Sequence, residues 1–312
     1  MRVSCVLKSV LLGTVFSLAS ATARAADLII YSPEPVAEQD TDFTLPAVSG
    51  INGKLEVAGG FLRTPGTTIG HARINGSLSI PVTDRFGLQG DLAIFNAPTG
   101  LGAAAALHAF TRDPNMYLLG VAAAAVRVPG ATLWAIGPEA ELYLDRISIE
   151  AWGGYANLNY DDIALADLSG IFAMADFAYY ISDDWRVSIG GRHVLGENQL
   201  RLATEYQVSS FQIPFSVTGE GRFATDGSIV ATIGLKHYIG DPDKSLIDRH
   251  RQDDPPDRAI DLFGSAGNLL YKTAAPGTTP EDPETACIEE YGSGAWVPDG
   301  EGGFECDPNW ND

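Results

Sequence analysis

Long hydrophobic runs are missing from this sequence beyond its first 25 residues. No later segment has about eighteen consecutive apolar residues, the length that a membrane-spanning helix needs. The most apolar region, residues 101–126, is interrupted by the polar stretch 111–115. We therefore expect no transmembrane helix in the mature chain.

Basic residues are also scarce. The chain has 20 Lys and Arg against 40 Asp and Glu, and its net charge is −20 at pH 7. Proteins that bind nucleic acid usually present a basic surface to the phosphates. We therefore expect no nucleic acid as a partner.

Cysteine occurs only three times, at Cys5, Cys287 and Cys306. Cys5 lies in the first 25 residues, and the other two lie close together near the C-terminus. In an exported protein such a pair predicts a disulfide. A zinc site would need further ligands, and the nearest histidine, His250, is distant in sequence. We expect neither a metal nor a cofactor.

Residues 1–25 have the pattern of a secretory signal peptide. Arg2 and Lys8 supply the positive end, residues 10–18 are apolar, and Ala23-Arg24-Ala25 is a small-residue cleavage site. No lipobox surrounds a cysteine at the cleavage point. The sequence therefore predicts an exported protein that is not a lipoprotein.

Alternating polarity is the main feature of the chain, and it is clearest in residues 168–195. Two alternating segments are joined there by an acidic turn at 182–184, and a period of two predicts strands. Aromatic residues crowd the turn, as expected where a strand reaches the lipid headgroups. On one face of the second segment lie Trp185, Val187, Ile189, Gly191 and His193, and on the other Arg186, Ser188, Gly190, Arg192 and Val194.

The same unit recurs about six times and gives twelve predicted strands. Two of them, 101–110 and 116–127, are alanine-rich and alternate weakly, so a helical hairpin is the alternative there. The predicted strands are 54–62, 69–80, 86–95, 101–110, 116–127, 132–144, 147–158, 171–181, 185–194, 200–206, 215–223 and 228–239.

A membrane barrel explains this pattern better than a soluble sandwich does. The apolar faces are apolar along nearly the whole strand, connections alternate in length, and aromatic residues gather at strand ends. A closed sheet pairs every backbone group without leaving an edge, which hydrocarbon requires. We predict a single antiparallel up-and-down transmembrane β-barrel of about 12 strands over residues 53–240. The alternative is a secreted or periplasmic soluble β-protein that binds a partner through its acidic tail.

The pattern over residues 53–240 resembles the outer-membrane β-barrel proteins of Gram-negative bacteria, the broad porin-like and opacity-type group. This resemblance implies an outer-membrane location and contact with its lipid. Such chains usually end at an aromatic residue that closes the last strand, whereas here Tyr238-Ile239-Gly240 is followed by more residues. With the amino end in the periplasm, the short connections at 82–85, 113–115, 145–146 and 182–184 lie on the periplasmic side.

If the apolar faces meet lipid, a set of side chains with both signs of charge points inward. These side chains either pair across strands and fill a narrow lumen, or line a water-filled path for ions or small solutes. Twelve strands lie between the eight that fill with side chains and the sixteen that leave a channel. The candidate lumen residues are His71, Arg73, Asp91, Glu139, Glu141, Glu150, Asp176, Arg186, Arg192, Arg201, Glu205, Glu220, Arg222 and Lys236.

Catalytic motifs of outer-membrane enzymes are not present. The phospholipase and lipid A deacylase barrels are similar in size, but they place a histidine two residues before a serine, and no histidine here has that spacing. The acidic pairs Asp161-Asp162 and Asp183-Asp184 suggest an omptin-like protease only weakly, because such pairs are common in turns. We expect a non-enzymatic protein.

The two ends of the chain differ from the barrel. Residues 26–52 form a polar lead, either periplasmic or an interior plug. Residues 241–312 form an acidic tail with 17 acidic and 5 basic residues, which we expect to be periplasmic and partly disordered. Within it, 243–251 could form a short helix, and Cys287 and Cys306 could close a small hairpin. The binding partner of this tail is unknown.

These observations predict a small porin for passive diffusion of ions or small solutes, or a structural surface protein, in the outer membrane.

Overall fold

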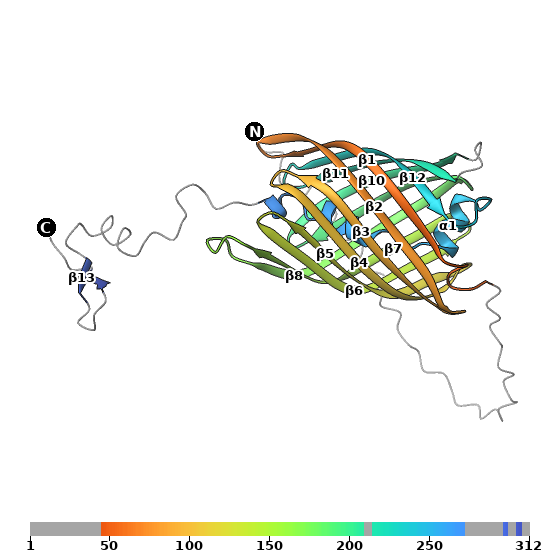
Figure 1. Cartoon of the computed structure of the whole chain (residues 1–312), viewed down its shortest axis with the longest axis horizontal. Helices are drawn as coiled ribbons and strands as arrows, with labels where there is room; N and C mark the ends of the chain where they lie inside the picture. Colours follow the sequence, from red (N-terminus) through yellow and green to blue (C-terminus); the bar gives the residue numbers. More distant parts are fainter. Residues whose placement is uncertain (1–44, 209–213, 272–295, 299–303, 308–312) are drawn as a thin grey trace, which may run out of the picture. The chain divides into compact units, whose positions relative to one another are not determined.

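The computed structural model describes residues 45–208, 214–271, 296–298 and 304–307, and its main feature is a closed barrel of twelve antiparallel strands (Figure 1). Each strand pairs with its neighbours in sequence, and β1 pairs with β12. The predicted up-and-down barrel is therefore confirmed. The strands are β1 (Asn52–Thr64), β2 (Thr67–Thr83), β3 (Phe86–Ala97), β4 (Gly100–Asp113), β5 (Tyr117–Val128), β6 (Ala131–Leu144), β7 (Ile147–Tyr160), β8 (Leu168–Ser182), β9 (Trp185–Val194), β10 (Glu197–Val208), β11 (Phe215–Ala224) and β12 (Ile229–Ile239).

Closure between β1 and β12 runs without interruption from the pair Gly53 and Ile239 to the pair Arg63 and Ile229. A barrel closed in this way has no free strand edge. The register shifts only at Pro81, in the β2–β3 pair, and near Tyr180, in the β8–β9 pair. A proline cannot donate to the ladder, so a bulge beside it is expected.

The outer surface of the barrel is apolar. Ile74, Leu142, Ile189 and Leu235 are 54%, 45%, 49% and 60% exposed. A two-layer soluble sandwich would have buried these side chains between its sheets. Their exposure indicates that hydrocarbon, rather than water, surrounds the barrel.

No helix in the described part of the chain is long and apolar enough to cross a bilayer.

The two ends of the barrel are named here by the course of the chain. At the near mouth β1 begins and β12 ends, and the turns at Asp145 and Asp183 lie there. At the far mouth lie the turn after Thr64 and the connection 161–167, which follows β7. Most turns at both mouths are short, so the contrast in loop length is smaller than the sequence predicted.

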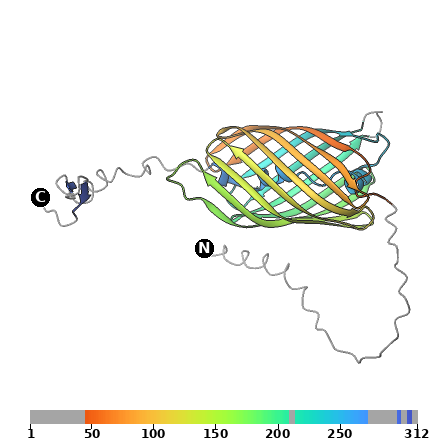
Figure 2. The same ribbon diagram turned by 60° about the horizontal axis from the view of Figure 1, so that its bottom comes forward.

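The barrel encloses three short helices, which we call the plug segment, residues 246–271 (Figure 2). They are α1 (Leu246–Gln252), α2 (Arg258–Ser265) and the 3₁₀ helix η1 (Gly267–Tyr271). α1 overlaps the predicted helix 243–251, but α2 and η1 were not predicted. The prediction of a periplasmic tail from residue 241 is wrong for this segment, because interior charges and an apolar wall of the barrel hold it inside.

The apolar wall is formed by β3, β4 and β5, against which α2 packs. The alanine-rich strands that the sequence left open are β4 and β5. Their inward positions carry small side chains such as Ala104, Ala106, Ala122 and Ala124, which belong to one buried cluster with Leu262 and others from α2. Small residues leave the space that a helix needs inside a barrel of this size.

Three predictions from the sequence concern residues that lie wholly or partly outside the described ranges. The signal peptide 1–25 and most of the lead lie before residue 45, and Cys287 lies in the interval 272–295. The disulfide with Cys306 therefore stays a prediction. β13 (Trp296–Pro298) and β14 (Phe304–Cys306) form an antiparallel pair with Trp296 opposite Cys306.

The described end of the lead lies at the near mouth. The Ala47 N–H donates to the Asp84 carbonyl at 2.8 Å, and the Ser49 N–H donates to the Gln252 carbonyl at 3.0 Å. Val48 is buried with Phe110 and other apolar side chains. This segment thus fixes the end of α1 to the barrel wall.

Candidate functional site

The structure places all fourteen candidate lumen residues on the inward face of the barrel. Ten are buried, and the side chains of the other four, Arg186, Arg201, Glu220 and Lys236, are at most 16% exposed. Their role in conduction stays a proposal. Their partners are both strand residues and plug residues, and three networks account for most of them.

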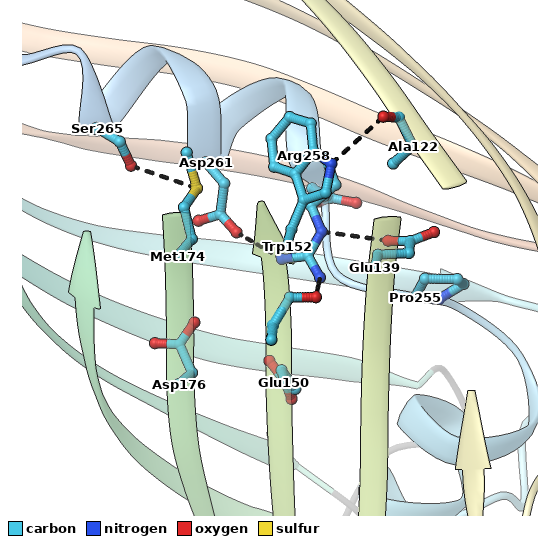
Figure 3. A network of polar contacts seen from close by, with 12 residues as sticks. Ala122, Glu139, Glu150, Trp152, Met174, Asp176, Pro255, Arg258, Asp261 and Ser265 are labelled. Atoms are coloured by element: carbon cyan, nitrogen blue, oxygen red, sulfur yellow. Dashed lines mark hydrogen bonds and ion pairs between the residues drawn. The ribbon is translucent and has the colours of Figure 1, made fainter. Parts of the chain in front are cut away.

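The first network attaches the start of α2 to strands β3, β4 and β6. His108 lies 3.0 Å from both Asp91 Oδ2 and Glu139 Oε1. The Arg258 N–H donates to Asp91 Oδ2 at 2.8 Å, and the Arg258 Nε donates to Glu139 Oε2 at 3.3 Å (Figure 3). The Arg258 guanidinium also lies over the Trp152 ring, with 5.7 Å to its centroid. One plug arginine therefore joins two acidic strand residues and an aromatic ring.

The second network surrounds Asp261, the acidic residue of α2. Its Oδ1 lies 3.1 Å from Arg222 Nη2 and 3.6 Å from Arg192 Nη2. Arg222 Nε lies 2.8 Å from Glu220 Oε1, and Glu220 Oε2 lies 2.7 Å from Arg201 Nη2. Arg201 and Arg192 also pair with Asp176. Buried charges of this density are tolerated because each has an opposite charge in reach.

The third network lies near α1. Lys236 Nζ lies 2.7 Å from Glu205 Oε2, and the Tyr238 hydroxyl donates to Glu205 Oε1 at 2.6 Å. His250 lies between the Tyr180 and Tyr238 hydroxyls at 2.9 and 3.1 Å. These two hydroxyls hold the His250 ring between β8 and β12.

Lys54 makes the contact between β1 and the link that joins α1 to α2. Its ammonium group donates to the Pro255 carbonyl at 2.8 Å and lies 3.0 Å from Asp257 Oδ1. Two ion pairs lie within the wall: Arg73 pairs with Glu56 at 3.3 Å, and Arg186 pairs with Glu150 at 2.6 Å.

Two further candidates have other neighbours. Glu141 accepts from the Tyr143 hydroxyl at 3.1 Å, and it lies opposite Glu150 in the β6–β7 register. His71 stacks on Phe263 of α2, with ring centroids 5.7 Å apart. Both interactions place these side chains inside the barrel.

Several interior residues were missed by the sequence reasoning. His108 and Lys54 are not among the candidates above, although both are buried and paired inside the barrel. Arg258 and Asp261 were assigned to the tail. A signal was available, because four of the five basic residues of the tail fall within residues 244–258.

A cavity lies between the plug segment and the wall. Its volume is about 110 Å³, which holds several water molecules. Charged side chains of both signs line it, among them Glu56, Arg73, Glu150, Arg186, Arg201 and Lys236. The space is polar and small, and it fits water or a small ion better than a larger solute.

No group of three or more His, Cys, Asp or Glu within the described ranges is arranged to hold a metal ion. The acidic residues of the connection after β7 are engaged by neighbouring groups. Asp161 pairs with Arg127 at 2.6 Å, and Asp167 accepts from the Asn159 side chain and the Tyr160 N–H, both at 2.9 Å.

A closed barrel with an apolar outside and a charged inside defines a transmembrane β-barrel, and the internal segment makes it a plugged one.

The barrel resembles solved structures of outer-membrane proteins, porins among them. The KdgM porin matches with 9% identity and a TM-score of 0.44 over 60% of this chain and 99% of that one. The Acinetobacter baumannii protein Omp33 matches with 8% identity and a TM-score of 0.37, over 61% and 98%. A mutant of the Rh. blastica porin matches with 12% identity and a TM-score of 0.27, over 61% and 99%. No protein-family model and no curated protein matches the sequence. The likeness concerns the strand arrangement alone.

Proposed function

We propose that this chain is a non-enzymatic outer-membrane barrel whose lumen is closed at rest by its own plug segment, and that it conducts ions or small solutes only as far as that segment allows. The observation that carries this proposal is the position of α2, which pairs with Asp91 and Glu139 on one wall and with Arg222 on another. The remaining cavity of about 110 Å³ is too small for a sugar or a peptide.

The location in the outer membrane is supported by the apolar outside of the barrel and by the predicted signal peptide. Membrane fractionation tests this part. A barrel should sediment with the outer membrane and migrate faster on a gel before heating than after it. Recovery of the whole protein in the soluble periplasm would favour the alternative of a soluble binding protein.

A structural surface protein is the second candidate, and it is supported by the near-complete pairing of charges inside the barrel. Conductance of the purified full chain in a planar bilayer separates the two roles. We expect small conductance from the unmodified protein and larger, fluctuating conductance from Arg258→Met, which loosens α2. Arg127→Ala is the control, because its ion pair with Asp161 lies on the outside, with side chains 54% and 51% exposed.

Silence of both proteins at all voltages would favour the structural role. A large and steady conductance of the unmodified chain would contradict closure by the plug segment. The lumen residues named from the sequence then become the candidates for selectivity, beginning with Arg186 and Glu150, which line the cavity.

A further inference from the structure

The plug segment enters the barrel at the near mouth. The Ile247 N–H donates to the Asp183 carbonyl at 3.0 Å, and the Leu246 N–H donates to Asp184 Oδ1 at 3.2 Å. Asp183 and Asp184 form the turn between β8 and β9. The first helix of the segment is therefore fixed at the same end at which β12 stops.

The segment ends at the far mouth. The Tyr160 hydroxyl donates to the Leu269 carbonyl at 2.9 Å. Tyr160 is the last residue of β7 and directly precedes the connection 161–167, at the opposite end of the 15-residue strand β8 from Asp183. Leu269 and Leu270 are buried with far-mouth side chains such as Leu158. The segment thus passes through the whole lumen.

The number of crossings decides on which side the chain continues. Twelve strands return the chain to the near mouth, and the plug segment crosses once more. We propose that this protein displays the part of its chain beyond Tyr271 on the membrane face opposite to the one at which β1 begins. With the near mouth toward the periplasm, residues 272–312 are carried to the cell surface.

Anchors at three depths hold this crossing in place. The near-mouth turn holds α1, the ion pairs of Arg258 and Asp261 hold α2, and Tyr160 holds η1. Phe263 adds a ring contact to Phe95. The cavity that remains has space for water but not for a second pass of polypeptide, so the chain cannot return through the same lumen.

The carried part has a distinct composition. Residues 272–312 contain ten acidic residues and one basic residue, Lys272, together with Cys287 and Cys306. The plug segment, in contrast, carries three arginines whose guanidinium groups donate to the barrel: Arg249 to Gln207, Arg251 to the Ile147 carbonyl and Arg258 to Glu139. The basic residues of the tail therefore serve the crossing, and the acidic excess is left for the exposed side.

The test compares three epitope positions in the full chain in intact cells. One epitope follows Asp312, one lies between Ile163 and Ala164 at the far mouth, and one lies between Pro114 and Asn115 at the near mouth. Heat-dependent gel mobility verifies that each variant is folded. We expect antibody to label the first two to about the same extent before and after permeabilisation, and the third only afterwards.

The result that overturns the proposal is an epitope after Asp312 that behaves like the one at Pro114. If the epitopes after Asp312 and Ile163 are both hidden and the one at Pro114 is labelled, the crossing is supported and the cell-surface direction is overturned. Protease added to intact cells carrying the untagged chain gives a second measurement. It should remove the part beyond Tyr271 and leave the barrel whole, and an uncut C-terminal part would contradict display. Neither outcome depends on conductance, so this inference and the proposed function can fail separately.

Discussion

The Arg258 guanidinium lies 3.3 Å from the Glu139 carboxylate, and the two side chains are 1% and 0% exposed. This pair joins the plug segment to strand β6 of the barrel wall. An ion pair removed from water in this way stabilises little by itself, because desolvation offsets most of the attraction. Loss of Arg258 is nevertheless costly, because the Glu139 carboxylate then remains buried with His108 as its remaining partner.

Replacement of Arg258 by Met should therefore release α2. The variant takes this cation from Glu139 and Asp261, which keep His108 and Arg222 as partners, and we expect a loss of about 1–3 kcal/mol in docking free energy. Hydrogen exchange of the backbone amides in residues 246–271 measures the docking. Combining Arg258→Met with Glu139→Gln should restore part of the protection. Arg127→Ala, whose ion pair is exposed, should cost at most about 1 kcal/mol. Equal exchange in Arg258→Met and the parent would refute this role.

Replacement of Phe263 by Ala should loosen the same helix through packing alone. Phe263 stacks on Phe95 and is 6% exposed, so truncation leaves a cavity against the alanine wall. Such truncations cost about 3–5 kcal/mol. We expect faster hydrogen exchange in α2 and unchanged heat-dependent mobility of the barrel. Ile163→Ala, at a position that is 88% exposed, serves as the control and should change neither.

Much of the barrel was predictable from sequence because lipid imposes a simple rule. Outward side chains between the two mouths must be apolar, so strands such as β2 and β9 alternate along most of their length. Ile74 and Ile189 face outward, and their neighbours Arg73 and Ser188 face inward, as the period of two predicts. The same alternation predicted which charged side chains lie on the inward face.

The alternation failed in β4 and β5 for a physical reason that the sequence does not show. Inward positions there meet the apolar side of α2 rather than water, so Ala104 and Ala122 replace the polar residues found elsewhere. With apolar residues on both faces, strand and helix patterns cannot be separated by period. The helical hairpin considered for this region is wrong.

The plug segment was not predictable because its helices are short and its surroundings are charged. α1 and α2 have seven and eight residues, too few for a clear helical period. Their arginines and aspartates have the composition of a solvated tail, and only the strand residues that pair with them, such as Arg222, show that they are enclosed. The composition predicted a charged segment, but it did not predict that the barrel encloses this segment.

Docking of α1 should weaken in acid because of His250. The docked His250 ring lies between the Tyr180 and Tyr238 hydroxyls inside the near mouth. Released histidine binds a proton below about pH 6.5, and an enclosed position disfavours the charged imidazolium. Docking should therefore weaken as the pH falls below about 6.5, because the released form then binds more protons than the docked form.

The neutral variant His250→Gln separates this effect from other titrating groups. Protease accessibility of residues 246–252 in the detergent-folded protein should rise more steeply between pH 7 and pH 4.5 in the parent than in the variant. The variant keeps every other charged group of the segment, so the difference between the two profiles reports on position 250. Parallel pH profiles would show that His250 does not act on docking.

Closure of the barrel should depend on Gly60. A Cβ added there would lie 1.8 Å from the Ala231 carbonyl oxygen of β12, and that oxygen belongs to the backbone, which cannot move aside without disturbing the β1–β12 pairing. Overpacking typically costs about 1–3 kcal/mol, and this contact is closer than most. Gly60→Ala should therefore lower the yield of the heat-modifiable, fast-migrating form. Gly191→Ala is the matched control, because nothing lies within 4 Å of its added Cβ in the same sheet. If both variants fold equally well, the β1–β12 pairing tolerates a backbone shift at Gly60, and closure of the barrel does not depend on this glycine.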